Sequence, residues 1–94
     1  MKYELRESTK FKKDLKKIQK RNKADLKKVY LILKILENEG FGGIPVSMKP
    51  HKLKDQYIDD RECHIKPDLL IIWFQVESPK IINLIRIGSH SDLF

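Results

Sequence analysis

Residues 69–74 read Leu69-Leu70-Ile71-Ile72-Trp73-Phe74, a continuous apolar run between two turn-forming segments. Such a run is typical of a strand deep inside a sheet, and it places Trp73 and Phe74 in the core. The turns are predicted at residues 66–68 and 77–79, and neighbouring strands at residues 58–65 and 80–87. We therefore predict a three-strand antiparallel meander with residues 69–76 as its middle strand.

Two helices are predicted upstream of the meander. Ser8 can cap the first helix, and its apolar stripe consists of Phe11, Leu15 and Ile18. Asn22 can cap the second helix, and Gly40 can end it. The apolar face of the second helix is expected to contain Leu26, Val29, Tyr30, Leu33 and Leu36. Because only a residue or two separates the helices, we expect an antiparallel hairpin.

The fold class follows from the order of these elements. Residues 3–5 alternate apolar and polar, which predicts a short N-terminal strand. Residues 40–57 contain three glycines and two prolines and predict a loop, and residues 89–94 predict a short tail. The prediction is a single α+β domain over residues 1–94. It has one N-terminal strand, the antiparallel two-helix hairpin, and the three-strand antiparallel meander in a single sheet with the helices on one face.

Charge divides the chain into two halves. Residues 1–49 carry 14 Lys and Arg against 6 Asp and Glu, a net charge of +8, whereas residues 50–94 have a net charge of −1. A basic face of this kind suits nucleic acid, an acidic membrane surface or an acidic protein. The single Cys63 excludes an internal disulfide and fits a reducing cytosol. No apolar stretch approaches the ~20 residues of a membrane span, so we expect a cytoplasmic protein.

All three histidines lie in the second half, at His51, His64 and His90. The unperturbed pKa of histidine lies near neutrality, so such residues on a basic protein suggest acid–base chemistry on a polyanion. The turn after His64 is expected to bring Asp68 close to it. We also expect strict strand alternation to place His90 nearer the beginning of the first meander strand than its end.

Three motifs follow one another in the sequence. The first is Pro50-His51 to Leu53, the second is Arg-x-x-His-x-x-x-Asp from Arg61 to Asp68, and the third is Arg-x-Gly-Ser-His-x-x-x-Phe from Arg86 to Phe94. In these motifs, and in element order over essentially the whole chain, the sequence resembles the YafQ group of bacterial toxins in the RelE/ParE superfamily. It departs from that group at Leu69, where a Trp can follow the Asp, and in a slightly longer turn at Ser78.

The resemblance implies a RelE/ParE-like fold and an endoribonuclease that cuts mRNA in the ribosomal decoding site, with no metal or cofactor. It implies that the catalytic residues are His51, His64, Asp68, His90 and Phe94, with Arg61 and Arg86 as supporting cations. The implied partners are the ribosome, mRNA and a cognate antitoxin, expected to be acidic and partly disordered. Operator DNA would be bound only through the antitoxin complex, and no membrane is involved.

Metal-free RNA cleavage needs a base for the 2′-hydroxyl, a cation for the phosphorane charge and an acid for the departing oxygen. We predict His90 as the acid and His64 or His51 as the base. Asp68 would fix a tautomer or share the proton transfer, and Phe94 would stack on a base, which contributes ~1–3 kcal/mol in other proteins. We further predict that the lysine-rich face of the first helix contacts rRNA, through Lys12, Lys13, Lys16 and Lys17.

Several alternatives stay open at this point. Asp68 could serve only the turn, Arg86 could pair with an acidic neighbour, and the lysine face could be merely solvated. Three histidines could also bind zinc, although the resemblance needs no metal. A Cys63–His64 dyad is disfavoured because adjacent strand residues face opposite sides. The competing function is a ParE-like DNA gyrase inhibitor or a nucleic-acid-binding module, and neither needs the histidine set.

Overall fold

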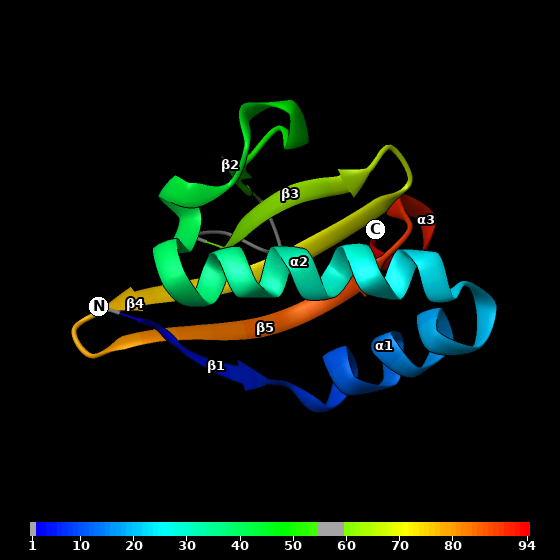
Figure 1. Ribbon diagram of the computed structural model, residues 1–94, viewed down its shortest axis with the longest axis horizontal. Helices are drawn as coiled ribbons and strands as arrows, with labels where there is room; N and C mark the ends of the chain where they lie inside the picture. The colour runs from blue at the N-terminus through cyan, green and yellow to red at the C-terminus, as the bar shows by residue number, and fades with distance from the viewer. Residues whose placement is uncertain (1, 55–59) are drawn as a thin grey trace.

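The computed structural model of the protein describes residues 2–54 and 60–94. The elements along the chain are β1 (Glu4–Glu7), α1 (Thr9–Arg21), α2 (Lys23–Glu39), the short 3-10 turns η1 (Gly40–Gly43) and η2 (Val46–Met48), β2 (His51–Lys52), β3 (Arg61–Lys66), β4 (Leu69–Glu77), β5 (Lys80–Gly88) and α3 (His90–Leu93). Among the described helices, none is long and apolar enough to cross a membrane. The α+β class is confirmed, with the elements arranged around one sheet (Figure 1).

The strands form one sheet in the order β1-β5-β4-β3-β2. The predicted meander is confirmed, because β3, β4 and β5 pair antiparallel in sequence. The predicted start of its first strand, residues 58 and 59, lies outside the described residues. Two strand features differ from the prediction: β1 joins β5 in parallel at one edge, and His51–Lys52 forms an edge strand on β3 where a loop was predicted.

The predicted helix caps are confirmed. The Ser8 hydroxyl accepts the Phe11 N–H at 3.0 Å, and the Asn22 side chain accepts the N–H groups of Ala24 and Asp25. Gly40 ends α2 with a φ of 67°, a conformation that favours glycine. The apolar face of α2 differs at two positions from the prediction, because Ile32 is buried although it was not predicted, and Tyr30 is exposed.

Tyr30 is 54% exposed, so its prediction as part of the apolar face is wrong. The fully packed positions of α2 are Val29, Ile32 and Leu36, spaced i, i+3 and i+7 as a helix requires. Tyr30 is one residue off that spacing and therefore turns toward solvent.

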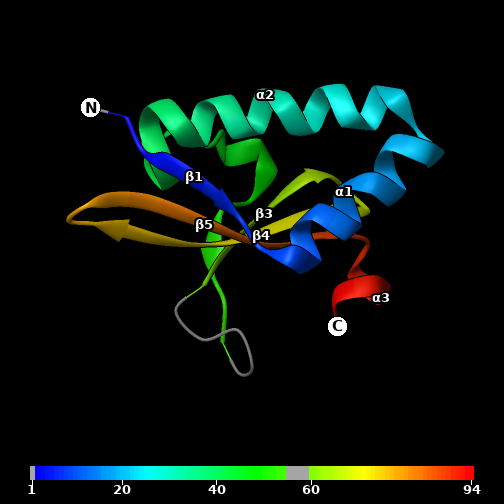
Figure 2. The same ribbon diagram turned by 90° about the horizontal axis from the view of Figure 1, so that it is seen from below.

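The sheet has two unlike faces, seen edge-on in Figure 2. One face carries α1, α2 and the main core, which includes Phe11, Ile32, Cys63, Ile71 and Trp73. The other face, hereafter the open face, carries a small cluster made by Leu70, Ile72 and Leu93. Successive residues of a strand point to opposite faces, so they belong alternately to the main core and to the small cluster.

Phe74 lies on the open face and is 40% exposed, whereas its neighbour Trp73 is fully buried. The prediction that both belong to the core is therefore wrong for Phe74, because adjacent residues of a strand point to opposite faces.

Residues 89–94 form a helical turn where a tail was predicted. The Ser89 hydroxyl accepts the Asp92 N–H, and the Asp92 carboxylate accepts the Ser89 N–H, a capping box at the start of α3. Leu93 is only 4% exposed and packs against Leu70 and Ile72. This apolar contact holds α3 on the open face of the sheet.

Candidate active site

The edge of the open face holds two histidines around one carboxylate. His51 on β2 pairs directly with Glu62 on β3, and its Nε2 lies 3.2 Å from the Glu62 Oε1. The Nε2 of His64 lies 3.7 Å from the same oxygen, and the two imidazole centroids are 6.4 Å apart. Glu62 is 4% exposed, so both rings border a buried negative charge.

The two imidazoles differ in their second nitrogen. The Nδ1 of His51 donates to the Lys49 carbonyl at 2.8 Å, because a carbonyl can only accept. Lys49 has a φ of 51°, a left-handed conformation that ends η2 just before Pro50. The His51 ring therefore satisfies both neighbours only when both nitrogens carry protons. Within the described part of the chain, His64 makes no hydrogen bond through Nδ1, so this nitrogen can accept a proton.

Sequence reasoning missed Glu62. A signal was present, because Glu62 and His64 are two residues apart on a predicted strand and must share a face. The predicted carboxylate was Asp68, which the resemblance implies and which the turn after His64 was expected to bring close. The structure therefore adds a residue to the predicted site.

Asp68 is exposed in the turn between β3 and β4. It borders a cavity of about 440 Å³ together with Ser89 and Asp92, whereas His64 borders a different cavity. No hydrogen bond or ion pair joins Asp68 to His64 among the described residues. The turn thus brings Asp68 toward the start of α3 rather than onto the His64 ring.

His90 begins α3, on the same face as His64. Leu70 pairs with His64 on one side and with Gly88 on the other, so β5 ends level with His64. Our expectation that His90 lies nearer the beginning of β3 is therefore wrong. An antiparallel meander reverses direction twice, so its third strand ends where the first one ends. The strands that carry His64 and Gly88 are two strand spacings apart, or about 10 Å.

His90, the first residue of α3, and Phe94, which follows α3, are both exposed and lie side by side. Their ring centroids lie 4.9 Å apart with planes inclined by 30°. Phe94 is 50% exposed. The anchored Leu93 and the capping box together hold this ring pair against the sheet.

The two predicted cations lie in different places. Arg61 turns to the helix-covered face, where its guanidinium carbon sits 5.0 Å from the centre of the Phe41 ring. Its Nε is buried without a hydrogen-bond partner among the described residues. Because Arg61 and His64 are three residues apart on one strand, alternation separates them. The structure does not bring Arg61 to the histidines.

Arg86 lies in the same row of the sheet as Glu62, since both pair with Ile72. Asp14 of α1 accepts from its Nε at 2.7 Å and its Nη2 at 3.1 Å. Asp14 also accepts the Ile87 N–H, in a stretch of β5 beyond the end of β1. Arg86 therefore pairs with an acidic residue, as the sequence analysis left open. That residue is Asp14, and it fixes the direction of the guanidinium.

The lysine-rich face of α1 borders α3. Lys12, Lys13, Lys16 and Lys17 are all exposed. Lys17 and Arg21 line a small cavity with Asp92, and their charges help to lower the pKa of that carboxyl, mainly set by its hydrogen bonds to Ser89. A positive field thus reaches the helix that carries His90.

Cys63 takes no part in this site. It is fully buried on the helix-covered face, opposite His64. Burial and the nearby Glu62 charge raise the pKa of its thiol to about 12. A protonated, enclosed thiol is a poor nucleophile, which agrees with the expectation that no Cys63–His64 dyad forms.

Comparisons with known proteins match nearly the whole chain. A family model described as "Bacterial toxin of type II toxin-antitoxin system, YafQ" matches residues 3–94. The mRNA interferase toxin YafQ of Escherichia coli strain B/BL21-DE3 is 32% identical over 87 residues, which cover 93% of this chain and 90% of that protein.

Two solved structures are similar in fold. The Escherichia coli DinJ–YafQ toxin–antitoxin complex superimposes with a TM-score of 0.87 and 29% identity, covering 100% of this chain and 99% of that chain. A metal-bound toxin from Helicobacter pylori gives a TM-score of 0.79 and 38% identity, with both chains fully covered. In the part of our chain that the structure describes, no group of three His, Cys, Asp or Glu side chains is arranged to hold a metal ion.

Proposed function

The chain belongs to the YafQ family of bacterial type II toxins and is an mRNA interferase, and we propose how it cuts RNA. The 2′-oxygen of the substrate attacks the adjacent phosphorus, and the bond from phosphorus to the 5′-oxygen breaks. A base takes the 2′-hydroxyl proton, and an acid gives a proton to the departing 5′-oxygen. The products are a 2′,3′-cyclic phosphate and a 5′-hydroxyl, so no co-reactant is needed.

His64 is the base and His90 is the acid in this proposal. The Nδ1 of His64 is able to accept a proton, and Glu62 on the other side stabilises the charge that the ring then gains. His90 stands about two strands away on the same face, so a phosphate fits between the two imidazoles. His51, with contacts that suit a doubly protonated ring, supplies positive charge near the phosphate.

Glu62 is a positioning residue, because it acts through His51 and His64 and does not itself face the substrate. Its burial keeps solvent from screening its charge, so its effect on both rings is larger than that of an exposed carboxylate. We propose Asp68 as a residue that supports the approach of RNA to α3, at the cavity that it shares with Ser89.

Arg86 is the cation that we propose for the phosphate, in preference to Arg61. Asp14 fixes the guanidinium in the row of the sheet that contains Glu62, and the permanent charge of the guanidinium attracts a phosphate. Phe94 stacks on a nucleobase next to the cut, since its ring is half exposed beside His90.

The substrate is mRNA held in the decoding site of the ribosome, in the cytoplasm. The exposed lysines of α1 (Lys12, Lys13, Lys16 and Lys17) would contact rRNA while the open face meets the message. A cognate antitoxin, as in the related DinJ–YafQ complex, silences the enzyme, and operator DNA is bound only through that complex. An acidic, partly disordered antitoxin suits the net charge of +8 in residues 1–49.

The observation that carries this proposal is the pair of imidazoles around the buried Glu62, with His90 held on the same face. The test is mRNA cleavage by the purified protein with and without ribosomes. Cleavage only with ribosomes, at positions within codons, is the expected result. Equal cleavage of free mRNA would overturn ribosome dependence, and no cleavage in either case would overturn the proposed chemistry.

A further inference from the structure

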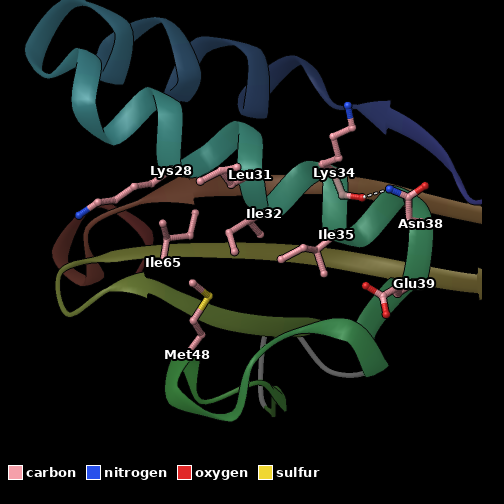
Figure 3. Close-up of a pocket in the computed structure, with 9 residues that line it drawn as sticks. All are labelled: Lys28, Leu31, Ile32, Lys34, Ile35, Asn38, Glu39, Met48 and Ile65. Atoms are coloured by element: carbon pink, nitrogen blue, oxygen red, sulfur yellow. Dashed lines mark hydrogen bonds between the residues drawn. The ribbon is translucent and has the colours of Figure 1, made fainter.

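The open face exposes a second aromatic ring besides Phe94. Among the described residues, exposed large apolar side chains occur in two places. Tyr30, Leu31 and Val46 belong to α2 and η2, where Leu31 borders a groove of about 520 Å³ (Figure 3). Phe74 and Phe94 lie instead on the face of the sheet that carries the candidate site. Phe94 has a role in the proposed chemistry, and Phe74 has none so far.

Phe74 continues the open face along β4 from the candidate site. Ile72, two residues earlier, pairs with Glu62 on one side and with Arg86 on the other. Strand alternation places Phe74 on the same face as Ile72, ~7 Å further along the strand. In the opposite direction α3 packs against Leu70, ~13 Å from Phe74. The row that contains Arg86 therefore lies between Phe74 and α3.

The neighbour of Phe74 on β5 is a polar residue, Asn83. The two residues are antiparallel partners, so their Cβ atoms stand ~5 Å apart. Phe74 is 40% exposed, and among residues 2–54 and 60–94 neither another ring nor a cation lies against its ring. Asn83 is partly exposed, and within the described part of the chain its side chain makes no hydrogen bond. Its amide can both donate and accept hydrogen bonds.

A ring and an amide side by side on a sheet suit single-stranded RNA. Such RNA is commonly bound by aromatic side chains on the face of a sheet, on which successive bases stack. Stacking tolerates any base, because every base has a π face, and selection comes from hydrogen bonds to the base edge. Phe74 supplies the first kind of contact and Asn83 supplies the second.

We propose that Phe74 and Asn83 form a base-binding position for a nucleotide that flanks the cut. The base stacks on the Phe74 ring, and the Asn83 amide hydrogen-bonds its edge and selects among the four bases. Phe94 and Phe74 then hold two different bases, with the Arg86 row between them. This inference deepens the proposed function and rests on it, because it places a further nucleotide of the same message on the open face.

The first experiment measures kcat/KM for ribosome-dependent mRNA cleavage by variants of Phe74. Phe74→Ala should lower kcat/KM by about 5–150-fold, the range that stacking on one base spans. Phe74→Leu keeps an apolar side chain without a planar ring and should lose most of this factor, whereas Phe74→Tyr should stay within about threefold of wild type. Tyr30→Ala is the matched control, because Tyr30 is an exposed aromatic residue on α2, and it should cleave like wild type.

The second experiment locates the base with messages that carry one abasic nucleotide, placed in turn at each site on either side of the cut. At one site the missing base should slow wild type about as much as Phe74→Ala does, and it should slow Phe74→Ala no further, because both changes remove the same contact. Asn83→Ala should reduce the preference among the four bases at that site and have no effect on the abasic message. Melting curves check that all variants are folded.

Wild-type activity in Phe74→Ala or Phe74→Leu would overturn the stacking role. Losses that simply add at every abasic site would overturn the base-binding position, and an unaltered base preference in Asn83→Ala would overturn selection by the amide. Full cleavage by Phe74→Ala together with weaker inhibition by the antitoxin would assign the ring to a protein interface instead. If wild type does not cut mRNA on ribosomes, the proposed function itself fails, and this is known before any variant is compared.

Discussion

On the helix-covered face of the sheet, Cys63, Ile71 and Trp73 are fully buried and polar groups are scarce, whereas on the open face Glu62 and His64 lie beside a cluster of only a few apolar residues. The same strands supply both faces, one residue after the other. Stability is therefore concentrated on one side of β3 and β4, and the proposed chemistry lies on the other. We expect substitutions of the open-face histidines to lower activity with little loss of stability, and substitutions in the buried core to lower stability.

The largest expected effect comes from breaking the helix-covered face. Trp73→Ala should cost ~3–5 kcal/mol of unfolding free energy, because the whole indole is buried and leaves a cavity. Phe74→Ala is its matched control, one residue along and 40% exposed, and should cost only about 1 kcal/mol. Urea denaturation of both variants measures the difference. Similar losses would mean that the two faces share one core.

The next effect concerns the open face itself. His64→Ala and His90→Ala should each slow cleavage by ~10²–10⁴-fold, the usual effect of losing a general base or acid. Phe94→Ala should lower activity through lost stacking of ~1–3 kcal/mol. Single-turnover cleavage on ribosomes, with melting temperatures close to that of wild type, gives the measurement. A gyrase inhibitor would poison supercoiling and ignore the histidine changes, so gyrase is assayed with the same proteins.

Glu62→Gln sharpens the comparison, because this residue is buried like the core yet belongs to the open face. The amide keeps the shape and removes the charge beside His51 and His64. A residue that orients catalytic groups typically contributes ~10–100-fold, so we expect a loss in kcat of that size. The pH–rate profile should change as well. A change in melting temperature with an unaltered profile would indicate a purely structural role.

Reversal of the α1 lysines, Lys12, Lys13, Lys16 and Lys17, to Glu should weaken ribosome binding and flatten its salt dependence, since each phosphate contact releases counterions. Chemistry on a bound message should be little affected. Co-sedimentation at several salt concentrations measures the slope. If the salt dependence of ribosome binding and the toxicity are both unchanged, the lysine face of α1 is only a solvated surface.

The smallest expected effect is at the cap of α3. Ser89→Ala removes a cap worth ~0.5–2 kcal/mol to a helix, which should loosen His90 and lower activity a few-fold. The hydrogen bonds from Ser89 lower the pKa of Asp92. The Asp92 contribution is therefore complete above the ordinary Asp pKa of ~3.9 and is lost only as pH falls through the lower folded value. The difference between wild type and Ser89→Ala in circular dichroism and in activity should therefore stay constant between about pH 6 and pH 8, because both values lie well above the pKa of Asp92.

Much of the fold could be predicted, because local signals decide it. Ser8, Asn22 and Gly40 act within a few residues of themselves, and the apolar run at Leu69–Phe74 has only one good place in a sheet. The parallel pairing of β1 with β5 could not be read from the sequence. Its partners are far apart along the chain, and a strand of four residues carries little pattern.

The candidate site was predicted by residue type but not by geometry. His51, His64 and His90 were named, and the structure brings the first two together. Glu62 was overlooked although its spacing from His64 fixes a common face, and Arg61 was included although its spacing fixes the opposite face. The helical turn at residues 90–93 depends on Leu93 finding Leu70 and Ile72, a tertiary contact that no local pattern reports.

The pairing of Glu4–Glu7 with residues 81–84 also determines when the sheet can form during translation. During translation the N-terminal part of a chain emerges first, and here β1 has no strand to pair with until β5 has left the ribosome. His90, the proposed acid, follows β5 and is therefore added after the strands of the sheet. A growing or truncated chain that lacks β5 therefore carries basic helices and no assembled site. We therefore expect the proposed site to be complete only after β5 and α3 have been translated.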